Sequence, residues 1–260
     1  MKTISRRAWN RYIDKLRQLD NKAAEEMIKY RAAVVADYEA GKVTASAARK
    51  SIVDYAFGTA TKYGEASASL ACEMYDAAAR LTGATVPAAI PAKTATYAET
   101  AKAVYGTLNQ NPEVMPAAVG RLVKQAGADT TMQNAIRDGA EWAWIPNGDT
   151  CAFCITLASQ GWMPASRDQL NGNHAEHIHA NCDCTFAIRF DGSSGVAGYD
   201  PDKYLSMYNG ADPGGSWRDK VNAMRREIYA KNADEINAQK RDAYEKRKER
   251  ESSEAEELNV

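Results

Sequence analysis

The residues of this chain that are best suited to chemistry are gathered in one short stretch. Four of its five cysteines and all three of its histidines lie there, in the order Cys151, Cys154, His174, His177, His179, Cys182 and Cys184. A tight turn can aim two thiolates at one ion when two residues separate them, and a second hairpin or strand can supply further ligands. Buried structural cysteines have no reason to recur at these spacings. The stretch therefore predicts a metal site.

Tetrahedral zinc needs four protein ligands, and this stretch offers five good ones. We expect four of the following to bind: Cys151, Cys154, His179, Cys182 and Cys184. Residues two apart in a strand point to one face, so Cys182 and Cys184 can reach the same ion, although His179 could take the place of one of them. His174 and His177 lie in a polar loop, where we expect them to be solvated or to hydrogen-bond to the ligands.

Three chemistries fit such a cluster. A zinc deaminase uses His-x-Glu followed by Pro-Cys-x2-Cys; residues 174–176 read His-Ala-Glu, but the cysteine pair comes earlier and Thr150 precedes it. A metal-dependent nuclease or other hydrolase is the alternative, suggested by His-x-His-x-Asn at residues 177–181, although few ligands are left for a second metal. The default is a structural zinc that is saturated by protein ligands and does no catalysis.

The spacing of apolar residues predicts the elements that must position this stretch. Helical periodicity begins at Trp9 and continues to Val34. The further helices expected in this half begin after Thr44 or Ser46 and end at Gly83, run from Tyr97 to Leu108, and cover about 117–126 and 130–139, with Pro112 and Pro116 as breaks. The intervening residues 84–95 contain two prolines and predict an extended segment or linker.

From residue 141 onward the pattern changes. An aromatic strand carrying Trp142 and Trp144, a short helix over 151–160 that ends at Gly161, and a strand over 184–190 predict a small module. Such a module has little apolar mass, and a structural zinc contributes roughly 10–16 kcal/mol of apparent binding free energy to folds of this kind. A highly charged helix is expected from Ser216 to about Glu251.

The predicted fold is therefore mainly α with a small α+β zinc-knuckle module, a helical N-terminal region and a long charged C-terminal helix. The expected domains are residues 1–135, 136–195 and 196–260. With a net charge of −1, the chain has no strong overall electrostatic field that would indicate binding to nucleic acid or to a membrane surface. We find no run of about 20 apolar residues and no apolar secretory segment near the N-terminus, and we expect a reducing compartment with thiolate ligands.

The stretch from Trp144 to Cys184 resembles a known signature. It reads Trp144-x5-Thr-Cys-Ala-Phe-Cys-Ile-Thr-Leu-Ala-Ser-Gln-Gly161, then a loop, then His179-x2-Cys-x-Cys184. This is similar to MuF-type minor capsid proteins of tailed bacteriophages, also called phage head morphogenesis proteins. The resemblance covers about residues 130–192. One departure is Asp183, where the family usually places arginine.

The resemblance implies a minor structural protein of the phage head. Such proteins are internal and portal-associated, aid head assembly or genome delivery, and would be found in the capsid interior or, during assembly, in the host cytoplasm. The implied partners are the portal, the major capsid protein and packaged DNA, with no membrane. No Gly-x-Ser-x-Gly or comparable nucleophile motif is present, so we expect no enzyme activity.

An apolar stripe on the first helix is the predicted contact with such a partner. It consists of Trp9, Tyr12, Leu16 and Leu19. Interface energy concentrates on aromatic and large apolar residues. The alternative is that the stripe packs within the chain's own helical bundle.

Overall fold

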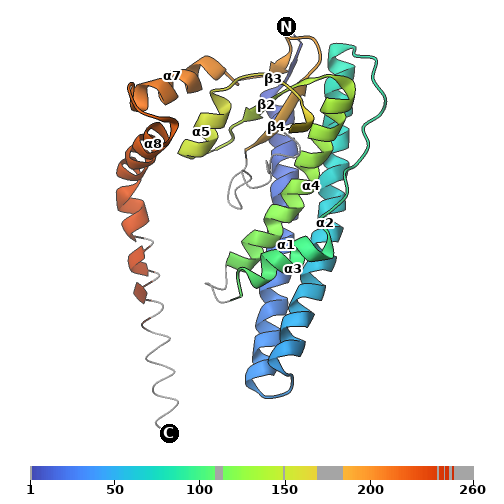
Figure 1. Cartoon of the computed structure of the whole chain (residues 1–260), viewed down its shortest axis with the longest axis vertical. Coiled ribbons are helices and arrows are strands. Elements are labelled where there is room, and N and C mark those ends of the chain that lie inside the picture. The colour runs from blue at the N-terminus through green and yellow to red at the C-terminus, as the bar shows by residue number, and fades with distance from the viewer. Residues whose placement is uncertain are drawn as a thin grey trace. The chain divides into compact units, whose positions relative to one another are not determined.

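The computed structural model describes residues 2–108, 114–148, 150–168, 184–238, 240–242, 244–245 and 248 (Figure 1). The chain divides into two compact units. The first comprises Met1–Thr150 and Gln160–Pro201, and the second comprises Cys151–Ser159 and Asp202–Val260. The described part is mainly helical with a small sheet, as the sequence predicts.

The first unit begins with a long antiparallel pair of helices, α1 (Arg6–Glu39) and α2 (Ala45–Thr82). Thr44 caps α2, because its side chain accepts a hydrogen bond from the backbone N–H of Ala47. The helix ends where Gly83 adopts a left-handed conformation with φ of 77°. Both boundaries confirm the prediction, since they depend on local capping chemistry.

Helices α3 (Tyr97–Tyr105) and α4 (Val114–Asp138) complete the bundle. The prediction of two helices in place of α4 was wrong. Pro116 is the third residue of α4, where the backbone N–H would have no partner within the helix, so proline does not break it. The helix also continues through Gly127, which was expected to lie in a gap and which instead lies against α2.

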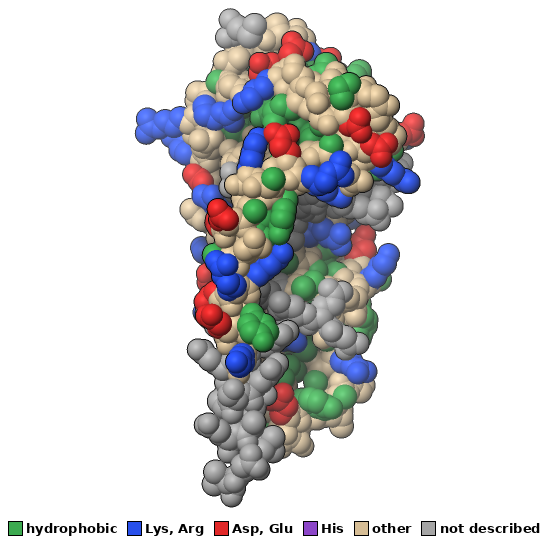
Figure 2. All heavy atoms as spheres, turned by 90° about the vertical axis from the view of Figure 1, so that its left-hand side faces the viewer, with side chains coloured by type: hydrophobic (Ala, Val, Ile, Leu, Met, Phe, Trp, Pro, Cys, Tyr) green, Lys and Arg blue, Asp and Glu red, His purple; other side chains and the backbone are tan. Residues whose placement is uncertain are grey.

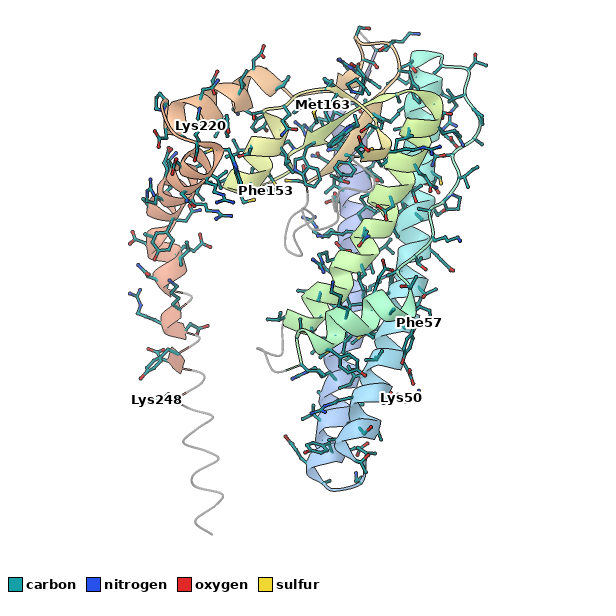
Figure 3. The ribbon with its side chains drawn as sticks, in the orientation of Figure 1. Lys50, Phe57, Phe153, Met163, Lys220 and Lys248 are labelled. Carbon is teal, nitrogen blue, oxygen red and sulfur yellow. The ribbon has the colours of Figure 1, made fainter. Side chains whose placement is uncertain are left out.

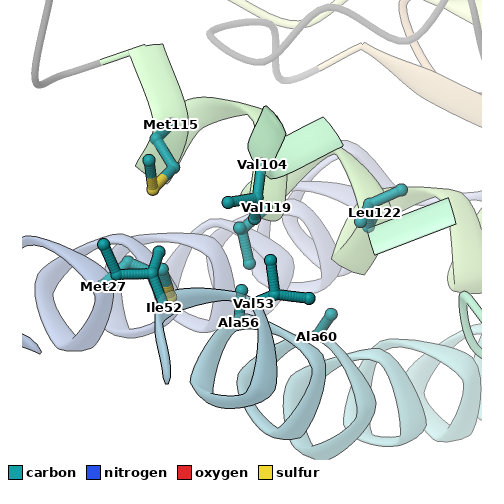
Figure 4. Packing of buried hydrophobic residues seen from close by; sticks show 9 residues of the cluster. All are labelled: Met27, Ile52, Val53, Ala56, Ala60, Val104, Met115, Val119 and Leu122. Carbon is teal, nitrogen blue, oxygen red and sulfur yellow. The ribbon is translucent and has the colours of Figure 1, made fainter. Parts of the chain in front are cut away.

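The core of the bundle is formed by small and medium-sized side chains from all four helices (Figure 4). Its members are Met27, Ile52, Val53, Ala56, Ala60, Val104, Met115, Val119 and Leu122. Two helices approach closely where glycine faces a neighbour. A Cβ atom on Gly127 would lie 2.6 Å from the hydroxyl oxygen of Ser67 and 3.3 Å from its carbonyl oxygen. The absence of a side chain at Gly127 is therefore what lets α4 pack against α2 at this point.

Residues 84–95 are extended, as predicted, and α4 holds them by side-chain hydrogen bonds. The Asn134 amide pairs with both backbone groups of Ile90, accepting from its N–H at 3.0 Å and donating to its carbonyl at 2.8 Å. The hydroxyl of Thr130 accepts from the N–H of Ala92 at 2.9 Å. These bonds satisfy backbone groups that have no partner in a helix or sheet.

A three-stranded sheet belongs to the same unit, with the order β3-β2-β4. Its strands are β2 (Glu141–Ile145), β3 (Met163–Pro164) and β4 (Thr185–Arg189). The ring of Phe186 lies edge-on to both Trp142 and Trp144, with centroids 4.9 Å apart in each pair. Phe190 contacts Tyr75 of α2 in the same manner at 5.5 Å. The sheet and the helical bundle therefore share aromatic packing.

A second, parallel pair of strands joins the start of the chain to the end of this unit. Strand β1 (Thr3–Ile4) pairs with β5 (Gly195–Val196). Neither strand was predicted, because two residues are too short to show the alternation that marks a strand.

The second unit contains α5 (Ala152–Ala158), α7 (Pro201–Ala211) and α8 (Trp217–Lys231). Ala152 and Ile155 pack with Val221 and Met224 in a small apolar cluster. The predicted helix from Ser216 is shorter than expected: α8 ends at Lys231, and residues 233–238 form a further helical run. Most residues of the predicted helix beyond 238 lie outside the described residues.

Candidate metal centre

Two of the predicted ligands lie in the first turn of α5. Cys151 is the N-cap residue, and its sulfur accepts a hydrogen bond from the backbone N–H of Cys154 at 3.5 Å. The side chain of Cys154 is fully buried. The Cys-x2-Cys spacing therefore places both cysteines within one helical turn.

A third predicted ligand, Cys184, directly precedes β4 and is buried. Its position is fixed by the register of the sheet, in which Thr185 faces Ile145 and Phe186 faces Trp144. Cys184 belongs to the first unit, whereas Cys151 and Cys154 belong to the second.

The remaining predicted residues, His174, His177, His179 and Cys182, lie outside the described residues. Within the part of the chain that the structure describes, no group of three or more His, Cys, Asp or Glu side chains is arranged to hold a metal ion. The side chains of Cys151 and Cys154 are of a type that fits zinc, since thiolates are among its preferred ligands. The identity of the four ligands stays a prediction.

Cys184 also lines a small cavity in the first unit that the sequence did not predict. The cavity measures about 30 Å³, which is room for a water molecule, and its other walls include Tyr12, Trp144 and Gly127. Asp20 of α1 and Lys124 of α4 form an ion pair in its wall, with 3.0 Å between Nζ and Oδ2. The sequence offered one indication of this ion pair. Asp20 follows Leu16 by four residues, so it lies on the side of the helix that faces the bundle.

The predicted partner-binding stripe is partly inside the protein. Trp9 is fully buried and Tyr12 is 6% exposed, and burial raises the pKa of the Tyr12 phenol above its ordinary value. Leu16 and Leu19 are half-buried. For Trp9 and Tyr12 the structure thus shows packing within the chain's own bundle, and Leu19 also packs against the buried cluster of Ala23, Tyr63 and Val123. A contact with a partner through this stripe stays a prediction that rests on the exposed parts of Leu16 and Leu19.

Helices of the described residues do not combine the length and the apolar content that are needed to cross a bilayer.

A family model described as VG15 protein matches residues 3–211. No curated protein and no solved structure matches the chain.

Proposed function

This chain belongs to the VG15 protein family, which indicates a phage protein, and we propose on that basis that it is a minor structural protein of a tailed phage head. It would lie inside the head, associate with the portal, and aid head assembly or genome delivery. The observation that carries the proposal is the overlap of two similarities. The family match covers residues 3–211, and these include the whole segment whose cysteine and histidine spacing resembles MuF-type minor capsid proteins.

A structural zinc is the second part of the proposal. The local geometry of Cys151 and Cys154 supports it, since both thiols lie in one helical turn and one accepts an N–H bond from the other residue. With four protein ligands, the ion would have no open position for water. The protein would then act through its surfaces, without enzyme activity.

The portal is the proposed main partner, with the major capsid protein as a second. The test is co-expression of the chain with each of these proteins, followed by affinity capture. We expect the portal to be captured. Leu16→Ala combined with Leu19→Ala should weaken capture if the stripe contributes, with urea unfolding used to show that the variant is folded. Unchanged capture by the folded variant would show that the stripe packs only within the bundle.

The zinc proposal is tested by the metal content of the purified chain. We expect one tightly held zinc ion in the wild type and in Cys72→Ser, a thiol on α2 outside the candidate stretch, and a clear loss in Cys154→Ser. Equal zinc in Cys154→Ser would overturn the site. Incubation with plasmid DNA and an added divalent metal tests the nuclease alternative: cleavage that Cys154→Ser abolishes would favour it over a structural role.

A further inference from the structure

A buried hydrogen-bond donor of the first unit lacks an acceptor. The indole Nε1 atom of Trp144 is buried and makes no hydrogen bond among the described residues, and the side chain is only 2% exposed. Trp144 lies on β2, the central strand of the sheet, and faces Phe186 of β4. Trp142 of the same strand faces Met163 of β3, which is labelled in Figure 3. Pairing on both sides fixes the backbone position of β2, and buried donors in folded proteins are usually satisfied by protein or by ordered water.

Trp144 forms part of the wall of the small cavity in the first unit, and an ion pair belongs to the same wall. Charged side chains commonly lie at the surface, as Figure 2 shows for one face of the molecule, whereas Lys124 and Asp20 are only 14% and 12% exposed. The Nζ atom of Lys124 lies 3.0 Å from one oxygen of Asp20, Oδ2. A carboxylate has about four acceptor sites on its two oxygens. The contact with Lys124 therefore does not use up the capacity of Asp20 to accept hydrogen bonds.

The size and the lining of the cavity select its ligand. The volume of about 30 Å³ exceeds the roughly 10–15 Å³ that one water needs, and it is far below the roughly 150 Å³ of a cavity that holds benzene. The wall carries a neutral donor in Trp144, a cation in Lys124 and an anion in Asp20. A bound anion would meet the carboxylate, and a bound cation would meet the ammonium group. A small neutral molecule that accepts one hydrogen bond and donates another avoids both repulsions, and water is such a molecule.

We propose that this cavity binds one water molecule, which accepts a hydrogen bond from Nε1 of Trp144 and donates one to the carboxylate of Asp20. The water supplies the acceptor that the indole lacks among the described residues, and it joins strand β2 to the ion pair between α1 and α4. A water that is buried among polar partners is part of the structure and is costly to remove. The helical bundle and the sheet are then connected by a polar contact as well as by the aromatic packing of Tyr75 and Phe190. Neither zinc nor the portal takes part in this contact.

A solution measurement tests the bound water through oxygen-17 magnetic relaxation dispersion, whose amplitude reports the number of waters that stay bound for long times. The test variant is Ala128→Val, because Ala128 is a buried residue of the cavity wall and the two added methyl groups fill the space without removing a polar partner. We expect the amplitude to fall by the contribution of one water. Ala118→Val is the matched control, since Ala118 lies on the same helix, is half-buried and is not among the described residues of the cavity wall. Circular dichroism shows that both variants are folded. Equal amplitudes in the wild type and the folded Ala128→Val variant, or an equal fall in the control, would contradict the proposal.

A crystal structure of the full wild-type chain tests the proposal without any variant. We expect an electron-density peak at hydrogen-bond distance, about 2.7–3.2 Å, from both Nε1 of Trp144 and an oxygen of Asp20. A second crystal, soaked in bromide, should show no anomalous signal at this peak. An ordered Trp144 beside a cavity without density would overturn the proposal, as would a direct hydrogen bond from Nε1 to a protein acceptor. A bromide signal would also overturn it, because it would assign the site to an anion.

Discussion

The Nζ atom of Lys124 lies 3.0 Å from Oδ2 of Asp20, and the two side chains are only 14% and 12% exposed. The pair joins α4 to α1 at the wall of the small cavity that also contains Cys184. Charges that are removed from water to this extent are stable only when they are paired. The pair therefore fixes how the first and last helices of the bundle meet.

Replacing Lys124 by Met should reduce the free energy of unfolding by about 3–5 kcal/mol, because it removes a mostly buried cation that lies 3.0 Å from the Asp20 carboxylate. Lys62→Met is the matched control. Lys62 also joins two helices through an ion pair, with Glu26 of α1, but its side chain is 61% exposed, so the loss should be about 1 kcal/mol or less. Urea unfolding measures both. Similar losses in the two variants would show that burial of the Lys124 pair has no energetic consequence.

The close approach of α4 to α2 predicts opposite effects for two glycines of the same helix. Gly127→Ala should destabilise the protein by about 1–3 kcal/mol, because the new methyl group meets Ser67. Gly120→Ala has open space and should be neutral or stabilise by up to about 1 kcal/mol through helix propensity. Adding Ser67→Ala to Gly127→Ala should restore part of the loss, since the nearest atom is then absent. Thermal unfolding of the four proteins tests this, and equal melting temperatures for the two glycine variants would contradict it.

The hydrogen bonds to Asp138 predict that the stability of the folded protein decreases at acid pH. Hydrogen bonds from Arg137, and then from Tyr75, hold the pKa of Asp138 below its ordinary value, against burial, which raises it. A carboxylate whose pKa is lower in the folded state contributes stability above its unfolded pKa, and this contribution is lost as the pH falls through the folded value. Asp138→Asn should therefore cost about 1–3 kcal/mol at pH 6 and should reduce the further loss of stability between pH 5 and pH 2. The free energy of unfolding across this range measures it. Asp234→Asn, a change at an exposed carboxylate, should leave the profile as in the wild type.

The ends of helices that are set by capping residues could be predicted from the sequence. Elements that form only through contacts with residues far away in the chain could not. Thr44 and Gly83 mark the ends of α2 through chemistry within a few residues. Pro116 was wrongly predicted to break the chain's helical structure. A proline is compatible with the first turn of a helix, and the sequence pattern did not show that α4 begins just before it. Strands β1 and β5 pair across the whole first unit, so neither strand carries a local signal. Helix α7 was likewise missed, since it follows a Tyr-Asp-Pro turn and buries no side chain fully.

The candidate site was predictable only in part, for a similar reason. The cysteine pair correctly predicted the start of a short helix at Cys151, because a helix start depends on local residues, whereas its role in metal binding stays a prediction. The stripe beginning at Trp9 was recognised as apolar, but periodicity alone does not show whether an apolar face meets the chain's own core or a partner. The buried pair of Asp20 and Lys124 required knowledge of which helices pack together.

The most direct test of the proposed function is the composition of purified phage heads. We predict that quantitative mass spectrometry of intact particles detects this chain in few copies relative to the major capsid protein. We also predict that external protease leaves it intact until the heads are opened. Absence of the chain from purified particles, or its complete digestion on intact heads, would contradict an internal structural role.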